Sequence, residues 1–154
     1  MMSEKTAKIF EKIKTIRKEY FPQYIKEELS APLPTISEFL YDYIINHNLS
    51  AAEVIKNSGL SKDYAYAILN GNRTNPTRDR VIALCLAMKM SFDDACSALA
   101  LCKNLLYPQD KRDAAIILCF YQKIYDINDV NLFLNENGLA VLETAKNFTS
   151  VSSG

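Results

Sequence analysis

Apolar residues recur at helical spacing from the start of the chain. The first set is spaced by four, three and four residues and consists of Ile9, Ile13, Ile16 and Tyr20. This spacing predicts an amphipathic helix over residues 4–20, with lysines on its polar back. An isolated helix of this length is marginal in water, so we expect the apolar stripe to need a partner. That partner is either the C-terminal helical hairpin described below or a second copy of the chain.

Three prolines separate this helix from the rest of the chain: Pro22, Pro32 and Pro34. They predict a linker, in which residues 24–29 form a short helical turn. Further helices are predicted by the apolar spacing over residues 36–47, 77–90, 92–103, 110–123 and 127–137. No segment shows the alternation typical of a strand, so the predicted fold class is all-α.

Residues 50–76 read as a helix, a tight turn, a second helix and an exit loop. Ser50, followed three residues later by Glu53, is a capping box that predicts the start of the first helix. Gly59 can adopt the left-handed conformation that ends it. Ser61 is predicted to cap the second helix, and Asn70–Gly71 to stop it. Two short helices joined through a glycine make a helix-turn-helix, which can place its second helix in the DNA major groove.

The spacing of this segment resembles the DNA-binding domain of lambda-repressor-like regulators, the xenobiotic-response-element family. The resemblance covers about residues 35–90. The matching residues are Ala52-Glu53-Val54, Ser58-Gly59-Leu60-Ser61, Ile68, Asn70-Gly71, Arg73, Asn75-Pro76 and Val81-Ile82-Ala83-Leu84. The resemblance implies a lambda-repressor-like helix-turn-helix bundle. Members of this fold also serve as antitoxins and protein-binding modules, so fold alone does not decide function.

The resemblance also implies a set of DNA-contacting residues. Those placed at base edges are Lys62, Asp63 and Ala67, and those placed at phosphates are Ser61, Tyr64 or Tyr66, Asn70, Asn72 and Arg73. Lysine can donate to guanine and aspartate can accept from cytosine, while a methyl group suits thymine. The two tyrosines would equally suit a protein-binding surface, because tyrosine is enriched at interface centres.

Charge is balanced over the whole chain but unevenly distributed along it. The formal net charge is zero. Residues 62–90, however, hold five basic side chains against two acidic ones. This basic block coincides with the second helix of the helix-turn-helix and its exit loop, where phosphates would lie. A solvated charged face would have the same composition, and the sequence leaves both interpretations open.

Two later segments match each other in register. Residues 78–89, RDRVIALCLAMK, match residues 112–123, RDAAIILCFYQK, at an offset of 34. One residue is then inserted, so Phe92, Asp94 and Leu99 match Ile127, Asp129 and Leu134 at an offset of 35. The match indicates either a common packing demand on helical hairpins or a duplicated module that forms a concave or dimerising surface.

Other chemistry receives no support from the sequence. The cysteines lack paired metal or redox spacing and are predicted to be buried free thiols: Cys85, Cys96, Cys102 and Cys119. No catalytic motif, metal-ligand cluster or glycine-rich phosphate loop is present, so we expect neither an enzyme nor a cofactor. No apolar run approaches the length of a membrane span and no secretory signal begins the chain, which favours a cytoplasmic protein without membrane contact.

The sequence therefore predicts a four-part organisation. An N-terminal amphipathic helix and linker occupy residues 1–34, and the helix-turn-helix domain residues 35–106. A C-terminal helical hairpin covers residues 107–146, and a disordered tail residues 147–154. We expect a sequence-specific transcriptional regulator that binds double-stranded DNA as a homodimer. The alternative is a protein-interaction adaptor or antitoxin of the same fold, with a co-transcribed protein as its partner.

Overall fold

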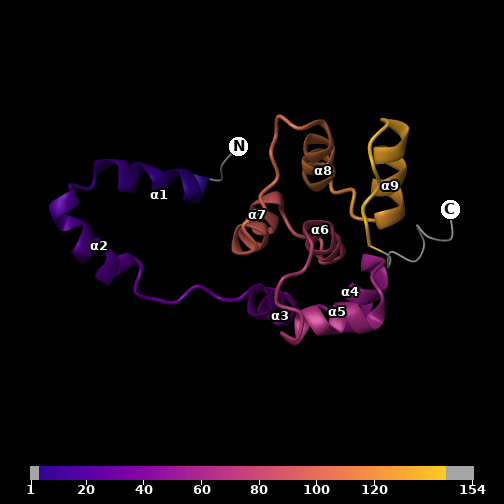
Figure 1. Cartoon of the computed structure of the whole chain (residues 1–154), viewed down its shortest axis with the longest axis horizontal. Coiled ribbons are helices and arrows are strands. Elements are labelled where there is room, and N and C mark those ends of the chain that lie inside the picture. The colour runs from indigo at the N-terminus through magenta and orange to yellow at the C-terminus, as the bar shows by residue number, and fades with distance from the viewer. Residues whose placement is uncertain (1–3, 145–154) are drawn as a thin grey trace. The chain divides into compact units, whose positions relative to one another are not determined.

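The computed structural model describes residues 4–144 and divides the chain into two compact units, Met1–Pro34 and Thr35–Gly154. All regular secondary structure within the described residues is helical (Figure 1). The predicted all-α class is confirmed. No helix of the described part is long and apolar enough to cross a membrane. The tail predicted over residues 147–154 lies outside the described residues.

The first unit contains α1 (Glu4–Thr15), a 3-10 turn (Lys18–Tyr20) and α2 (Phe21–Glu28). The prediction of one helix over residues 4–20 is wrong, because the α-helix ends at Thr15. Arg17 is extended, with φ −74° and ψ 139°. Pro22 then lies at the start of α2, where its missing N–H costs nothing. A helix continuing through Pro22 would lose a hydrogen bond and clash, so the chain instead begins a new helix, longer than the predicted turn.

The apolar stripe of the first unit is largely exposed. Tyr24 is buried, and Lys12 lies 5.8 Å from its ring centroid and 3.3 Å from the carboxylate of Glu28. These contacts connect α1 with α2. In contrast, Ile9 and Ile13 remain 46% and 47% exposed. Contacts within this unit therefore leave the face predicted to need a partner largely uncovered.

Deleting residues 1–24 should lower the melting temperature or shift the mass measured by light scattering toward that of a monomer. Burying the half-exposed isoleucines against another surface would lower the free energy of the folded state. A helix of this length is also only marginally stable alone. An unchanged melting temperature together with an unchanged mass would show that this face is not covered in solution.

The second unit is organised around one buried helix. Its helices are α3 (Ile36–Asn46), α4 (Ala51–Ser58), α5 (Lys62–Leu69), α6 (Arg78–Ala87), α7 (Phe92–Leu101), α8 (Lys111–Tyr121) and α9 (Ile127–Glu136). Six consecutive residues of α6, Val81 to Leu86, are buried, so this helix is covered on all sides. It packs against α4, α7 and α9, while α3 packs against α5 and α7 (Figure 1).

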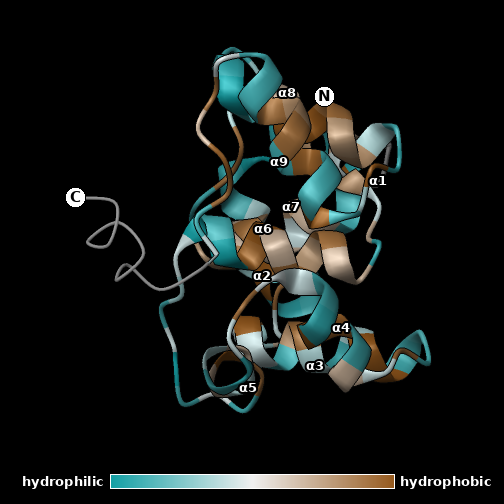
Figure 2. Ribbon diagram, turned by 90° about the vertical axis from the view of Figure 1, so that its right-hand side faces the viewer, coloured by the Kyte–Doolittle hydropathy of each residue, from teal (hydrophilic) through white to brown (hydrophobic). Residues whose placement is uncertain are grey.

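The C-terminal hairpin belongs to the same hydrophobic core as the helices before it. Ile116 and Cys119 of α8 and Leu134 of α9 are fully buried, in one cluster with Leu84 of α6. Figure 2 shows the hydrophobic run along α8. Residues 35–106 and the described part of 107–146 thus form one compact unit rather than two.

Several helices end earlier than the sequence predicts because residues with positive φ follow them. Lys89, Lys103 and Lys123 have φ angles of 56°, 56° and 58°. After Lys89, the backbone N–H of Met90 donates to the carbonyl of Cys85 at 3.1 Å, and Ile124 donates equivalently to Cys119 at 2.9 Å. These bonds close Schellman-type turns, for which glycine or asparagine is the usual residue. Because lysine stands at these positions, the sequence did not indicate that the helices end there.

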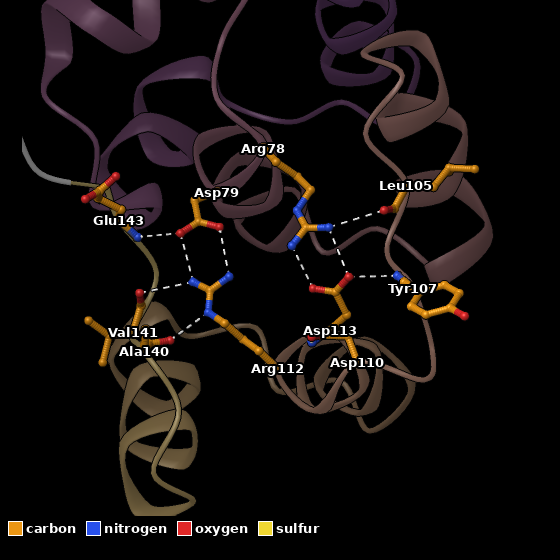
Figure 3. A network of polar contacts seen from close by, with 10 residues as sticks. All are labelled: Arg78, Asp79, Leu105, Tyr107, Asp110, Arg112, Asp113, Ala140, Val141 and Glu143. Carbon is orange, nitrogen blue, oxygen red and sulfur yellow. Dashed lines mark hydrogen bonds and ion pairs between the residues drawn. The ribbon is translucent and has the colours of Figure 1, made fainter.

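The duplicated Arg-Asp dipeptides at the starts of α6 and α8 bind each other across the two helices (Figure 3). Arg78 contacts both carboxylate oxygens of Asp113, at 3.0 and 2.7 Å. Reciprocally, Arg112 contacts both carboxylate oxygens of Asp79, at 3.2 and 2.8 Å. Paired, planar bonds of this kind are the strongest form of arginine–carboxylate contact. A packing requirement therefore explains why this dipeptide occurs in both segments.

The same two carboxylates also fix nearby backbone. Asp113 accepts from the N–H of Tyr107 at 2.7 Å, and Asp79 accepts from the N–H of Glu143 at 2.9 Å. Arg112 further donates to the carbonyl of Ala140 at 2.8 Å. The two ion pairs thus attach the loop before α8 and the segment after α9 to the helical core (Figure 3).

Candidate nucleic-acid interface

Two serines and a glycine fix the two ends of α4 and the turn that leads into α5. The hydroxyl of Ser50 accepts from the N–H of Glu53 at 3.2 Å, as expected for the predicted cap. At the other end of α4, buried Ser58 donates to the carbonyl of Ile55 at 2.7 Å and accepts from the N–H of Leu60 at 3.1 Å. Gly59 has φ 77°, the left-handed conformation that the sequence predicts there. These bonds set the direction in which α5 leaves the turn.

One side of α5 is buried and its first turn is exposed. Ser61 accepts from the N–H of Tyr64 at 3.2 Å and caps the helix. The predicted inward residues Ala65, Ile68 and Leu69 are all buried, at 0%, 0% and 7% exposure. Lys62 in the first turn is exposed. The helix therefore presents its polar N-terminal turn to solvent while its apolar side packs on the core.

The C-terminal end of α5 is anchored to α3. Buried Ser37, in the first turn of α3, donates its hydroxyl to the carbonyl of Ile68. Gly71 follows with φ 87°, and a Cβ at that position would lie 3.9 Å from the Ser37 hydroxyl. Because this carbonyl is buried, its bond to Ser37 offsets the cost of removing it from water. The position of α5 is thus determined at both ends.

The exit loop turns back alongside α5. The side-chain oxygen of Asn70 accepts from the N–H of Asn72 at 2.9 Å, an Asx turn. The N–H of Arg73 donates to the carbonyl of Ala67 at 2.8 Å. This second bond places Arg73 beside the helix rather than away from it.

Two guanidinium groups lie against one tyrosine ring. Arg73 is 4.6 Å from the ring centroid of Tyr64, and Arg80, from the first turn of α6, is 4.4 Å from it. Arginine at this distance is attracted by the negative face of the ring. Sequence reasoning missed Arg80 as a site residue, although it lies in the basic block 62–90. The sequence carried no signal for this contact, because it depends on where the start of α6 lies relative to α5 in the fold.

The structure places all the predicted DNA-contacting residues on α5, at its cap or in the loop that follows. Ala67 and Tyr64 are partly buried, and the others are exposed: Ser61, Lys62, Asp63, Tyr66, Asn70, Asn72 and Arg73. Nothing in the sequence distinguished Tyr64 from Tyr66, but their surroundings in the structure differ. Tyr64 contacts the arginines, whereas Tyr66 is 39% exposed.

The cysteines lie away from this surface and have weakly reactive environments. Cys85 and Cys119 are buried free thiols, as predicted, whereas Cys96 and Cys102 are only partly buried. Burial raises the pKa of the Cys96 thiol to about 11, with a further contribution from the charge of Asp93. A thiol with a raised pKa carries little of the nucleophilic thiolate at neutral pH. Within residues 4–144, no group of three or more acidic, cysteine or histidine side chains could hold a metal ion.

Comparisons with known proteins leave the site to be interpreted from its own geometry. No family model, curated protein or solved structure matches the chain. The observations that bear on its chemistry are therefore the exposed first turn of α5, the returning exit loop and the two arginines on Tyr64.

Proposed function

We propose that the chain is a cytoplasmic, sequence-specific DNA-binding regulator that inserts α5 into the major groove. In this proposal α4 and α5 are the two helices of a helix-turn-helix. The observation that carries it is the two-sidedness of α5. Its apolar side is buried in the core, while Lys62 and Asp63 project from an exposed N-terminal turn beside two arginines. Helix-turn-helix proteins use the N-terminal residues of the second helix to contact base edges.

The first turn of α5 has groups suited to a G·C pair. Lys62 can donate to guanine O6 and N7, and Asp63 can accept from cytosine N4. Neither side chain takes part in the ion pairs of the described residues, so both are available to a ligand. Ala67, one turn further along, offers a methyl group to thymine.

The groups around this turn suit phosphate oxygens. Arg73 lies over the ring of Tyr64, is exposed and takes part in none of the ion pairs of the described residues, so its guanidinium N–H groups can donate to phosphate. Asn70 uses its side-chain oxygen within the exit loop, so its amide N–H₂ can donate outward. Contacts of this type position a protein on DNA and supply most of the salt-dependent affinity.

The proposal includes a homodimer. A single helix-turn-helix contacts too little DNA for tight binding, whereas two copies can occupy half-sites roughly 34 Å apart. Exposed apolar residues available for the dimer contact occur on α1, described above, and on the C-terminal hairpin. On the hairpin, Tyr121 and Leu132 are 51% and 56% exposed.

Alanine substitutions of Lys62 and Arg73 should weaken DNA binding in different ways. Lys62→Ala should cost about 1–3 kcal/mol on the preferred site, with little change on scrambled DNA, because it removes a base contact. Arg73→Ala should weaken binding to both duplexes. It should also reduce the slope of log affinity against log salt by about one unit, because it removes a phosphate contact. Fluorescence anisotropy at two salt concentrations measures both effects.

A protein-interaction adaptor or antitoxin is the second candidate function. It is favoured by exposed apolar side chains on α3, where Tyr41 and Ile45 are 52% and 54% exposed and four residues apart. Exposed apolar residues at this spacing form one helix face that a protein partner could cover. If neither Lys62→Ala nor Arg73→Ala changes DNA affinity, this second function replaces the first.

A further inference from the structure

A groove in the second unit lies outside the residues proposed to contact DNA. It has a volume of about 820 Å³ and is bounded by the ends of α4 and α6 and by the start of α9. None of the residues from Ser61 to Arg73 lines it. Its size falls within the range of pockets that hold small molecules.

Three lysines from three different elements line this groove. Lys56 belongs to the last turn of α4, Lys89 follows α6, and Lys123 follows α8. All three are exposed. None takes part in the ion pairs found among the described residues. Three basic residues around one groove favour an anion over a cation there.

Two acidic side chains of the groove offset part of the charge of the lysines. Asp126 caps α9, accepting from the N–H groups of Asn128 at 2.8 Å and Asp129 at 3.1 Å, and it keeps its negative charge there. Asp129 is the other carboxylate on the groove, so the three lysines stand against two carboxylates.

Lys89 and Lys123 occupy equivalent, strained positions. They are 34 residues apart in the two matching segments, and both have positive φ, 56° and 58°. Glycine or asparagine holds this left-handed conformation with less strain. Both matching segments nevertheless carry lysine there, and both lysines face the same groove. Lys103 at the end of α7 has the same conformation without lining the groove, so the helix ends account for the conformation, and it is the shared position of Lys89 and Lys123 that concerns the groove.

We propose that this groove binds a phosphorylated small molecule, with Lys56, Lys89 and Lys123 contacting a diphosphate or triphosphate group. Ile124 and Tyr125 form an apolar wall for the rest of the ligand. The hydroxyl of Tyr125 donates to the carbonyl of Met90 at 3.1 Å, which holds the ring against the segment that follows α6. This second site is independent of the proposed DNA contact and could be occupied whether or not α5 binds DNA.

Calorimetric titration of the full chain with inorganic pyrophosphate and with ADP tests the proposal. Lys123→Gly should weaken binding of both probes about tenfold, because it removes a charged hydrogen-bond donor. It should also raise the melting temperature by about 2–4 °C, because glycine relieves the left-handed strain. The matched control is Lys103→Gly. Lys103 has nearly the same φ as Lys123, 56° against 58°, but does not line the groove, so this variant should gain stability without losing affinity.

Three results would overturn the proposal. The first is no binding of pyrophosphate or ADP to the unaltered chain at millimolar concentration. The second is an equal loss of affinity in Lys103→Gly, which would indicate only general attraction between the protein and anions. The third result concerns a DNA duplex, for which Lys123→Gly should leave the affinity unchanged. A parallel tenfold loss there would assign the lysines to the DNA backbone instead.

Discussion

Replacing Asp113 by alanine should lower the free energy of unfolding by about 3–5 kcal/mol, the range for breaking a buried ion pair. The side chain of Asp113 is 5% exposed and accepts from Arg78 through both oxygens. It also accepts from the backbone N–H of Tyr107. Its removal leaves Arg78, whose side chain is 25% exposed, without its carboxylate partner, and it also releases the loop before α8.

Urea denaturation followed by circular dichroism measures this loss. Asp79→Ala is the matched comparison, because it breaks the reciprocal pair with Arg112 in a less buried setting, with side chains 17% and 20% exposed. We expect a smaller loss there. Glu11→Ala, in an exposed pair with Lys14, should leave stability unchanged. A loss of unfolding free energy below about 1 kcal/mol for Asp113→Ala is the level of an exposed ion pair. That result would mean that the ion pairs between α6 and α8 do not stabilise the fold.

Replacing Ile68 by alanine should cost about 2–5 kcal/mol, because buried methyl groups are lost and a cavity is left. Ile68 is fully buried, in one cluster with Val54, Ile44 and Leu84. It lies on α5, which packs against α3 and α4, so its loss should also loosen the surface proposed to bind DNA.

Ile45→Ala provides the control for this second substitution. Ile45 lies on α3 and is 54% exposed, so its truncation should change stability by less than about 0.5 kcal/mol. Denaturant unfolding of both variants gives the comparison. If Ile68→Ala is as mild as Ile45→Ala, the side of α5 that faces the core has been misassigned.

Local signals in the sequence were sufficient to predict four of the helix starts. Ser50, Ser61, Ser91 and Asp126 each cap a helix as the spacing predicts. A cap depends on residues within one turn, so no knowledge of the tertiary structure is needed. The same holds for Gly59, whose left-handed conformation few other residues adopt readily.

Helix ends and long-range contacts could not be read in the same way. Lys89 and Lys123 take a conformation that their residue type disfavours, so propensity extended α6 and α8 too far. The match between the two segments showed that each carries an Arg-Asp dipeptide. It did not show that the arginine of each dipeptide pairs with the aspartate of the other, because the pair of Arg78 with Asp113 forms only when α6 and α8 are neighbours. The contact of Arg80 with Tyr64 likewise depends on how α6 packs beside α5.

The central claim is that α5 reads a DNA sequence. Its most direct test is to select duplexes from a random pool with the full chain. The affinity of the selected duplex is then compared with that of a scrambled duplex at about 50 and about 200 mM salt. Phosphate-dependent binding differs strongly between these two concentrations. We predict a preference for the selected duplex of about 10³-fold or more, half-sites about one helical turn apart, and weaker binding at the higher salt concentration. Equal affinity for both duplexes, unaffected by salt, would contradict the claim.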